Sequence, residues 1–264
     1  MTNRFSMAGR TVAVTGAAGI LGQRFCAELL EAGARVAAID ISEEALGMLR
    51  EKLGVGPVLS THCADIRERE QVAEVRAKAS ETLGEIDGLL NNAATKSPNF
   101  FEPFESFPCE DWEYVMSVNL LGAMVCCQEF GGSMARHGQG SIVNVLSVYG
   151  VVAPDQRIYE GSEYLGHAIN SPAVYSASKS GLWGLTAYLA SYWGARGVRV
   201  NALTPGGIFS GQNETFVNRY SARVPMGRMG QPDELCGALV YLLSDAAKYV
   251  TGQNIVVDGG LTVW

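Results

Sequence analysis

Short strand signals alternate with helix signals along almost the whole chain, and this alternation limits the possible folds more than any other feature of the sequence. The first strand signal, Thr11–Thr15, is β-branched and nearly all apolar, as expected of a strand buried on both faces. A helical pattern follows it and ends near Gly33, and the next strand signal starts at Arg35. Repeated units of this kind predict parallel strands joined by right-handed crossovers in a doubly wound sheet.

No break in composition marks a linker between domains. The sequence therefore predicts a single α/β domain over residues 1–264, with a seven-stranded parallel sheet flanked by helices on both faces. The further expected strands are Arg35–Ile39, Val58–His62, Ile86–Leu90, Ser141–Leu146, Val198–Leu203 and Asn254–Val257. The further expected helices are Glu43–Leu53, Gln71–Leu83, Trp112–Arg136, Ala173–Ala195 and Asp233–Ser244.

Composition excludes several classes of protein. Hydrophobic residues make up 47% of the chain and charged residues 18%, which is ordinary for a globular protein. The net charge of −7 argues against a nucleic-acid partner. The first ten residues lack an apolar signal-peptide core, and no apolar run approaches the length of a membrane span, so a cytoplasmic location without membrane contact is expected.

The six cysteines are expected to be structural. They form no Cys-x-x-Cys pair and have no histidine at metal-ligand spacing, and most of them lie in apolar stretches. Neither a metal site nor a disulfide framework is expected from Cys26, Cys63, Cys109, Cys126, Cys127 and Cys236.

A glycine-rich turn directly follows the first strand signal and indicates a nucleotide site. Gly16, Gly19 and Gly22 are spaced three apart, which allows a tight turn, close approach of the backbone to a pyrophosphate and close helix–strand contact. The N-terminus of the helix that follows offers unpaired N–H groups to phosphates. The alternative is an ordinary glycine-rich loop, because this pattern alone is weak.

Asp40 ends the second strand signal, 24 residues beyond Gly16, where an acidic group reaches the adenosine ribose of a dinucleotide. Its carboxylate would accept from both ribose hydroxyls and repel a 2′-phosphate, so NAD is favoured over NADP unless Asp40 is simply a surface residue. Asp65, after the third strand, is a candidate acceptor for the adenine amino group. Asn92 and Ala93, after the fourth, suit a ribose packed on the backbone, and either segment could be a plain turn.

Tyr175 and Lys179 stand one helical turn apart and suit acid–base chemistry. A phenol has an ordinary pKa of about 10, and a neighbouring cation favours its ionised form and draws that pKa towards working pH. Ser147, at the end of the fifth strand, is expected to hold the substrate oxygen, and Asn119 to fix a water that connects Lys179 to solvent. An ordinary amphipathic helix is the alternative explanation of the Tyr-x-x-x-Lys pattern.

With these residues in place, the chain resembles the short-chain dehydrogenase/reductase family nearly end to end. The resemblance implies a Rossmann-type sheet, NAD(P)-linked oxidoreduction, a homodimer or homotetramer with the Tyr/Lys helix at an interface, and a catalytic tetrad of Asn119, Ser147, Tyr175 and Lys179. The matching segments include Thr15-Gly16, Asn91-Asn92-Ala93, Pro205-Gly206-Gly207 and Val257-Asp258-Gly259-Gly260. The cofactor site is expected to comprise Gly16, Ala18, Gly19, Ile20, Leu21, Asp40, Asp65, Ile66, Asn92, Ala93, Tyr175, Lys179, Pro205, Gly206 and Ile208, with the Ile208 backbone on the nicotinamide carboxamide and Lys179 on the nicotinamide ribose.

The sequence departs from the short members of this family at two places. Ile20 stands where they usually have glycine, so the glycine spacing is that of the longer, sugar-nucleotide-modifying branch. Ser147 and Tyr175 are 28 residues apart, about twice the usual separation, so an insertion is expected at about 149–172. Tyr149, Tyr159 and Tyr164 also lie in this region, but Tyr175 alone has a lysine one turn onward in an apparent helix.

The insertion is rich in hydrogen-bonding and aromatic residues, which suits a hydroxylated substrate, although it could be a solvated loop or an oligomer contact. Its segment Tyr149–Gly161 is similar to dehydrogenases of flagellin-glycan and nonulosonic-acid sugar pathways. A lid is expected at about 208–228, with arginines that could meet a sugar phosphate or carboxylate or be surface charge. The expected substrate residues are Ser147, Tyr149, Arg157, Tyr175 and Gly207, with Asp155, Gln156, Glu160 and His167 as further candidates and Arg219, Arg223 and Arg228 in the lid.

Three functions therefore remain open. The leading one is an NAD-dependent dehydrogenase that oxidises a secondary hydroxyl of a sugar-like or polyol substrate, with Tyr175 as acid/base. The second is a carbonyl reductase that works in the opposite direction on an acyl or cyclic ketone. The third is an NAD-binding sensor or scaffold without turnover, which would have no chemical need for Ser147, Tyr175 and Lys179 together.

Overall fold

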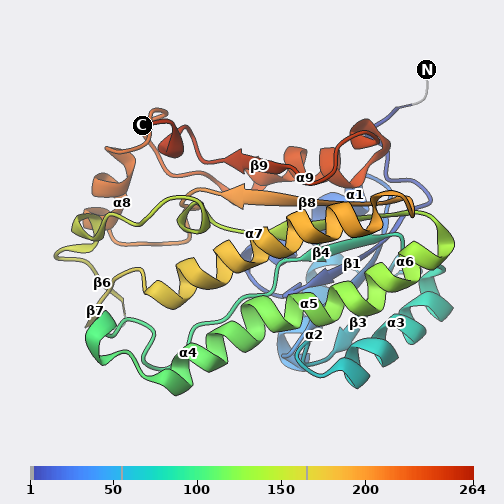
Figure 1. The fold of residues 1–264 in the computed structure, drawn as a ribbon, viewed down its shortest axis with the longest axis horizontal. Helices are drawn as coiled ribbons and strands as arrows, with labels where there is room; N and C mark the ends of the chain where they lie inside the picture. Colours follow the sequence, from blue (N-terminus) through green and yellow to red (C-terminus); the bar gives the residue numbers. More distant parts are fainter. Residues whose placement is uncertain (1–2, 55, 165) are drawn as a thin grey trace.

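A seven-stranded parallel sheet forms the centre of the computed structural model, which describes residues 3–54, 56–164 and 166–264 (Figure 1). The strand order β3-β2-β1-β4-β5-β8-β9 reverses direction between β1 and β4, so the expected doubly wound Rossmann-type fold is confirmed. The strands are β1 (Thr11–Thr15), β2 (Arg35–Asp40), β3 (Leu59–Cys63), β4 (Gly88–Asn91), β5 (Gly140–Val145), β8 (Val198–Pro205) and β9 (Asn254–Val257).

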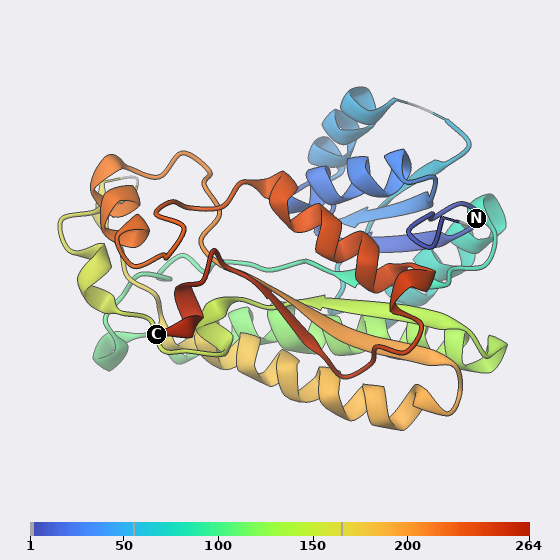
Figure 2. The ribbon, with the colours of Figure 1, turned by 90° about the horizontal axis from the view of Figure 1, so that it is seen from above.

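Helices cover both faces of this sheet. Figure 2 shows α1 and α9 on one side, with α7 and the long helix that contains α4, α5 and α6 on the other. The helices are α1 (Ile20–Glu31), α2 (Glu43–Leu53), α3 (Arg69–Leu83), α4 (Cys109–Met116), α5 (Ala123–Cys126), α6 (Gly132–His137), α7 (Ala173–Gly194), α8 (Glu214–Ser221) and α9 (Cys236–Leu243). π-helical turns at Ser117–Gly122 and Cys127–Gly131 join α4, α5 and α6, and short 3-10 helices lie at Phe104–Ser106, Val148–Gly150, Gln156–Tyr159, Pro232–Leu235, Asp245–Ala247 and Leu261–Val263.

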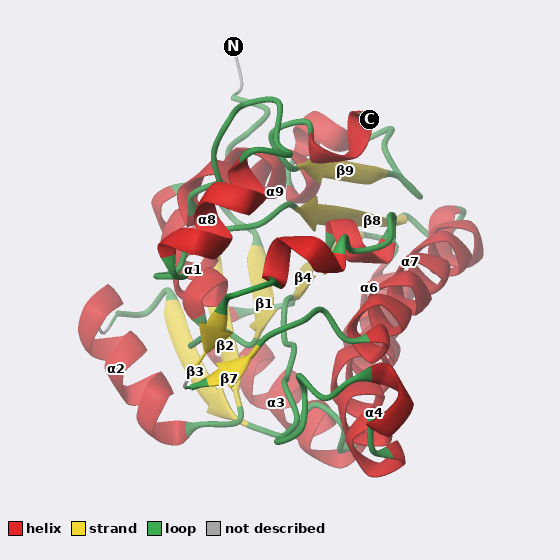
Figure 3. Cartoon of the chain, turned by 90° about the vertical axis from the view of Figure 1, so that its left-hand side faces the viewer, coloured by secondary structure: helices red, strands yellow, loops and turns green. Residues whose placement is uncertain are grey.

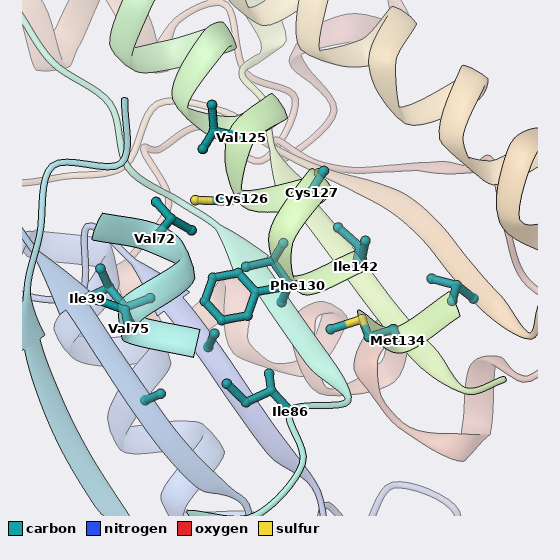
Figure 4. Close-up of a cluster of buried hydrophobic side chains, with 14 of the residues drawn as sticks. Ile39, Val72, Val75, Ile86, Val125, Cys126, Cys127, Phe130, Met134 and Ile142 are labelled. Carbon is teal, nitrogen blue, oxygen red and sulfur yellow. The ribbon is translucent and has the colours of Figure 1, made fainter. Parts of the chain in front are cut away.

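The alternation of side chains along each buried strand builds two cores. On β1, Val12 and Val14 face the core under α1 and α9, whereas Ala13 faces the core under α3 and the long helix. Figure 4 shows the second core, where Phe130 lies among aliphatic side chains. Burying one such side chain stabilises the fold by roughly 1.5–3 kcal/mol. Because both faces of these strands are buried, their sequences are nearly continuous apolar runs.

The structure differs from the sequence-based expectation mainly in the connections. Helix α8 was not expected, and Asn213 starts it by accepting a hydrogen bond from the N–H of Phe216 with its side chain. The expected helix Asp233–Ser244 begins instead as a 3-10 turn, because Pro232 and a capping box between Gln231 and Glu234 fix its first residues.

The carboxyl ends of the strands face the viewer in Figure 3, and the insertion at 149–172 lies in front of them. It contains a small antiparallel hairpin of β6 (Glu163–Tyr164) and β7 (His167–Ala168), which lies between α8 and the segment before α4. The side chains of Tyr164 and His167 fall outside the described part of the structure. Among the described residues, no helix combines the length and the apolar character that crossing a membrane requires.

Candidate active site

A cleft of about 850 Å³ runs along the carboxyl edge of the sheet, from the ends of β2 and β3 past β1 and β4 to α7. This position is where ligands bind in doubly wound folds. We call it the main cleft. Its wall contains most of the expected cofactor residues, namely Gly16, Ala18, Gly19, Ile20, Leu21, Asp40, Asp65, Ile66, Asn92, Ala93 and Tyr175.

The glycine turn is shaped by two close backbone contacts. Gly16 has a φ of +62°, and a Cβ there would lie 2.7 Å from the Cα of Ala93. A Cβ on Gly22 would lie 2.0 Å from the carbonyl oxygen of Gly16. Gly19 is the N-cap of α1, has no side chain to cap it, and together with Ile20 faces the main cleft. The first turn of α1 therefore presents its N–H groups to the cleft, which fits a pyrophosphate.

Asn92 holds the glycine turn against the end of β4. Its side-chain amide donates to the carbonyl oxygens of Thr15, at 3.1 Å, and Gly16, at 3.0 Å. The hydroxyl of Thr15 accepts in return from the backbone N–H groups of Asn92 and Ala93, at 3.1 and 3.2 Å. Asn92 thus shapes the cleft wall by bonding the backbone.

Asp40 is held at the cleft by two backbone N–H groups. Ala18 donates to one carboxylate oxygen at 3.0 Å and Ser42 to the other at 3.2 Å. The backbone N–H of Ala18, an expected cofactor residue, is therefore bonded to Asp40 in this structure. A carboxylate has about four lone-pair sites, so Asp40 retains acceptor capacity for two ribose hydroxyls.

Asp65 lies in the same wall but is already paired with Arg67. The Nε of Arg67 lies 2.9 Å from one carboxylate oxygen, and the backbone N–H of Arg67 lies 2.9 Å from the other. These hydrogen bonds hold the pKa of Asp65 below its usual range despite partial burial. The Arg67 guanidinium also lies over the Tyr114 ring, 5.5 Å from its centroid, so this pair borders the far end of the cleft.

Tyr175, Ser147 and Lys179 meet where the main cleft reaches α7. Tyr175 and Ser147 share a side-chain hydrogen bond, and Tyr175 lines the cleft. The ammonium of Lys179 is buried, lies 5.9 Å from the centroid of the Tyr175 ring and donates to the carbonyl oxygen of Val145 at 2.8 Å. The structure therefore brings together three of the four residues expected to be catalytic.

Burial disfavours the charged forms of both Tyr175 and Lys179. It raises the pKa of Tyr175, an effect that the hydrogen bond with Ser147 opposes, and it lowers the pKa of Lys179 to about 8. The expectation that the ammonium draws the phenol's pKa down is therefore not met in this structure, because burial of the phenol is the larger influence. A carbonyl oxygen and an aromatic ring face the ammonium.

Asn119 lies in the π-helical turn Ser117–Gly122, a type of irregularity that is frequent at functional sites. Its side chain is buried, accepts from the N–H of Thr95 at 2.9 Å and donates to the hydroxyl of Ser178 at 3.2 Å. Ser178 in turn donates to the carbonyl oxygen of Tyr175 at 2.9 Å. Asn119 therefore contacts α7 between Tyr175 and Lys179 and braces that turn of the helix.

The residues directly after β8 do not line the main cleft, although Gln212, further along the same segment, does. Gly206, Gly207 and Ile208 line a separate cavity of about 70 Å³, and Pro205 is buried at the end of β8. The N–H of Gly207 donates to the hydroxyl of Tyr220, whose ring fills the space that a side chain on Gly207 would need. The structure thus does not bring these four residues into the wall that holds Tyr175.

The insertion places two of its tyrosines in the main cleft. Tyr149 and Tyr159 share a hydrogen bond, and Tyr159 also bonds Ser171. Desolvation raises the pKa of both phenols, which therefore stay protonated and can both donate and accept. Tyr149 was an expected substrate residue, whereas Tyr159 and Ser171 were not.

Arg157 is not brought to the cleft. Its side chain is 83% exposed, and its guanidinium pairs with Asp155 two residues earlier, at 2.8 Å. Asp155 also pairs with Arg223 of the lid at 2.8 Å, and Arg219 donates to the carbonyl oxygen of Arg157 at 3.0 Å. Gln156 instead bonds the backbone of Ser171, and Glu160 lies 3.7 Å from Arg219. The third lid arginine, Arg228, pairs with Glu234 at 2.6 Å.

Several residues of the cleft wall were not predicted from the sequence. The main ones are Lys96, Phe100, Tyr159, Asn170, Ser171 and Gln212. These residues come from segments whose path no periodicity predicts.

No group of three or more His, Cys, Asp or Glu side chains in the described ranges is arranged to hold a metal ion. All six cysteines fall in these ranges and are free thiols, of which Cys63 and Cys109 are exposed. Burial raises the pKa of Cys26 and of Cys127 to about 12, which makes them poor nucleophiles.

Comparisons with known proteins identify the family of the chain. Residues 10–220 match the family model described as short chain dehydrogenase. The D-threitol dehydrogenase of Mycolicibacterium smegmatis is 33% identical, over 98% of this chain and 95% of that protein. The 3-oxoacyl-[acyl-carrier-protein] reductase FabG of Thermotoga maritima is also 33% identical, over 97% and 98%. A gluconate 5-dehydrogenase from Burkholderia cenocepacia, solved with NADP and tartrate, has a TM-score of 0.86 and 31% identity, with 99% of this chain and 98% of that chain covered.

Proposed function

The chain belongs to the short-chain dehydrogenase family and is an NAD(P)-dependent oxidoreductase acting on CH–OH groups, and from this premise we propose its cofactor, substrate class and acid–base residue. It is proposed to transfer a hydride between NAD and a secondary alcohol or ketone of a sugar-like or polyol substrate. Tyr175 is the proposed acid/base. The observation that carries the proposal is that one cleft joins the Gly16 turn and Asp40 to Tyr175, which bonds Ser147 and has Lys179 beside it.

The residues present fit a dinucleotide. The N-terminus of α1 would hold the pyrophosphate, and Asp40 would accept from the adenosine ribose. A 2′-phosphate would meet the charge of Asp40, and the next residues, Ile41 and Ser42, supply no cation, so NAD is proposed over NADP. When bound, the nicotinamide supplies or accepts the hydride.

The chain's own residues handle the proton and the substrate oxygen. In the oxidising direction, the hydroxyl of Ser147 donates to the substrate oxygen, and the ionised Tyr175 takes the alcohol proton as the C–H hydride leaves and the C=O bond forms. Lys179 favours the ionised phenol by its charge. The carbonyl oxygen of Val145 fixes where that charge lies.

A hydroxylated substrate is supported by the hydroxyl groups of four residues in the cleft wall, Tyr149, Tyr159, Ser171 and Tyr175, and by Ser147 beside Tyr175. The similar D-threitol dehydrogenase is named for a polyol. A second candidate, reduction of an acyl ketone, is favoured by the similarity to the 3-oxoacyl reductase of Thermotoga maritima.

The chain is further proposed to act in the cytoplasm as a homodimer or homotetramer. Its single domain would carry the insertion at 149–172 and a lid at 208–228 over the substrate. The two segments are packed together by a cluster in which the Tyr159 ring lies 5.3 Å from that of Phe216 on α8.

The test is a screen for NAD reduction over polyols, sugars, sugar phosphates and hydroxyacyl thioesters, repeated with NADP. We expect turnover of at least one polyol or sugar and a preference for NAD. Turnover of thioesters alone would overturn the substrate class, and a preference for NADP would overturn the role of Asp40. Absence of turnover in both directions would favour the sensor alternative.

A further inference from the structure

A second cavity of about 890 Å³ adjoins the catalytic end of the main cleft, and we call it the outer cavity. Its walls are the insertion on one side and the segment Glu102–Trp112 with the start of α7 on the other. The two cavities have five wall residues in common, Tyr149, Tyr159, Asn170, Ser171 and Pro172. The two cavities therefore border each other at these residues, and Tyr175 lines the main cleft beside them.

The shared wall is polar and fixed in place. Tyr149, Tyr159 and Ser171 are joined by hydrogen bonds between their side chains. The amide of Asn170 donates to the carbonyl oxygen of Phe101 at 2.7 Å, which ties the insertion to the opposite wall. Substrate hydroxyl groups next to the reacting carbon would meet this polar wall.

Beyond the shared wall the outer cavity is mainly apolar. Its remaining lining includes Phe104, Phe107, Trp112, Val151, Val152 and Ile169. Phe104 is 73% exposed, Val151 49% and Val152 38%, so water faces apolar surface here unless a ligand covers it. Phe107 and Trp112 belong to the same packed cluster as the Tyr175 ring, which makes this apolar wall continuous with the catalytic end.

We propose that the substrate has two parts, a hydroxylated part that reacts at Tyr175 and an apolar group, of aryl or alkyl type, that occupies the outer cavity. This inference rests on the proposed function and names its substrate class more narrowly. The polar wall selects the hydroxylated part, and the aromatic and aliphatic wall beyond it binds the apolar group by removing its surface from water.

The experiment measures binding to the NADH-loaded protein by calorimetry with matched probes. Phenyl and methyl β-D-glucopyranoside differ only in the apolar group, and the corresponding galactopyranosides provide a second pair. We expect the phenyl compound of at least one pair to bind at least about tenfold more tightly than its methyl counterpart. Equal binding within each pair, or no binding by any of the four, would overturn the inference.

Two cavity-filling variants show where the apolar group binds. Val152→Trp and Ala153→Trp each place an indole in the outer cavity at an exposed backbone position, and Ala77→Trp on α3 is the control. In the two cavity-filling variants, the affinity ratio of the phenyl over the methyl glycoside is expected to fall below about threefold. The control variant should keep the wild-type ratio, and all three variants should bind NADH with wild-type affinity. A preference that survives both fillings would place the phenyl group elsewhere and contradict the proposal.

The polyol screen separates this inference from the proposed function. If polyols or sugars are oxidised but phenyl and methyl glycosides bind alike, the bipartite substrate is wrong and the dehydrogenase activity stands. If no hydroxylated compound is oxidised, the proposed function itself fails.

Discussion

At the scale of single residues, the site depends on the phenol of Tyr175, which lines the main cleft, and on the buried ammonium of Lys179. Burial raises the pKa of Tyr175 and lowers that of Lys179 to about 8, so each group alone resists ionisation. The proposed role of Lys179 is to make ionising the phenol easier while the lysine is charged. The carbonyl oxygen of Val145 and the hydroxyl of Ser147 are the polar contacts that fix this pair.

Replacing Lys179 with Met should move the pH dependence of oxidation. Oxidation needs the ionised phenol, so the rate rises with pH through the apparent pKa of the pair. Without the ammonium 5.9 Å from the ring, the ionised phenol is less favoured and its pKa rises further. We expect kcat/KM at pH 8 to fall by about 100-fold or more and the rising limb to shift upward by about one unit or more. The pH profile of kcat/KM should be measured from pH 6 to 10. A rising limb at the same pH as in the wild type would contradict the role of Lys179.

The Asp40 carboxylate should decide between the two dinucleotides. Asp40→Ser removes the charge that would face a 2′-phosphate, so the ratio of kcat/KM for NAD over NADP should fall by about tenfold or more. Glu81→Gln, at an exposed position on α3, changes the net charge equally and should leave the ratio unchanged. If the NAD-over-NADP ratio of kcat/KM is the same in the wild type and in Asp40→Ser, Asp40 does not discriminate between the two dinucleotides.

At the scale of elements, the insertion and α8 form one packed unit, and the insertion lines the end of the main cleft that holds Tyr175. An aromatic cluster that includes Tyr159, Phe216 and Tyr220 joins them. Arg223 adds an ion pair with Asp155, whose pKa its partners, Arg157 foremost, lower to about 2. Two of the three arginines expected to meet an anionic substrate, Arg219 and Arg223, are thus bonded to the insertion, whereas Arg228 pairs with Glu234.

Arg223→Met should loosen this unit without disturbing the cofactor end. We expect amide hydrogen exchange in residues 149–172 to accelerate by roughly fivefold, a modest effect because both partners of the lost pair lie near the surface. Arg228→Met is the matched control, since Arg228 pairs with Glu234 outside the insertion. If amide exchange in residues 149–172 accelerates equally in both variants, the ion pair of Arg223 does not stabilise the insertion.

The regular elements were predictable from the sequence because each has a local cause. β1, α2 and β9 lie at the expected residues, since a buried strand or an amphipathic helix is encoded in its own apolar pattern. The expected residues Gly16, Asp40, Ser147 and Tyr175 follow strand ends or start a helix, so the fold alone places them. Tyr159 and Ser171 were missed because hydrogen bonds between distant loop residues position them, and no local pattern encodes that pairing.

At the scale of the whole molecule, the parallel sheet brings distant segments to one edge. The glycine turn after β1 and the Tyr/Lys pair on α7 are far apart in sequence, yet both line the main cleft. On α7, Tyr188 and Tyr192 are 62% and 57% exposed, and their rings stack with centroids 5.7 Å apart. Exposed aromatic pairs of this kind are typical of interfaces between subunits.

The proposed oligomer can be tested on this pair. Light scattering should give a dimer or tetramer for the wild type, and the double variant Tyr188→Glu, Tyr192→Glu should give a smaller species, because buried like charges oppose association. Met48→Glu, at a position 63% exposed on α2, serves as the control and should not change the mass. A monomeric wild type, or a double variant of unchanged mass, would contradict an interface on α7.

The most direct test of the whole account is the single-turnover rate of hydride transfer in Tyr175→Phe, which removes one hydroxyl group and keeps the ring against Phe100. If Tyr175 is the acid/base, the rate should fall by about 10²–10⁴-fold while the Kd for NADH stays within about threefold of the wild-type value. A variant that transfers hydride at more than about a tenth of the wild-type rate would show that another group moves the proton.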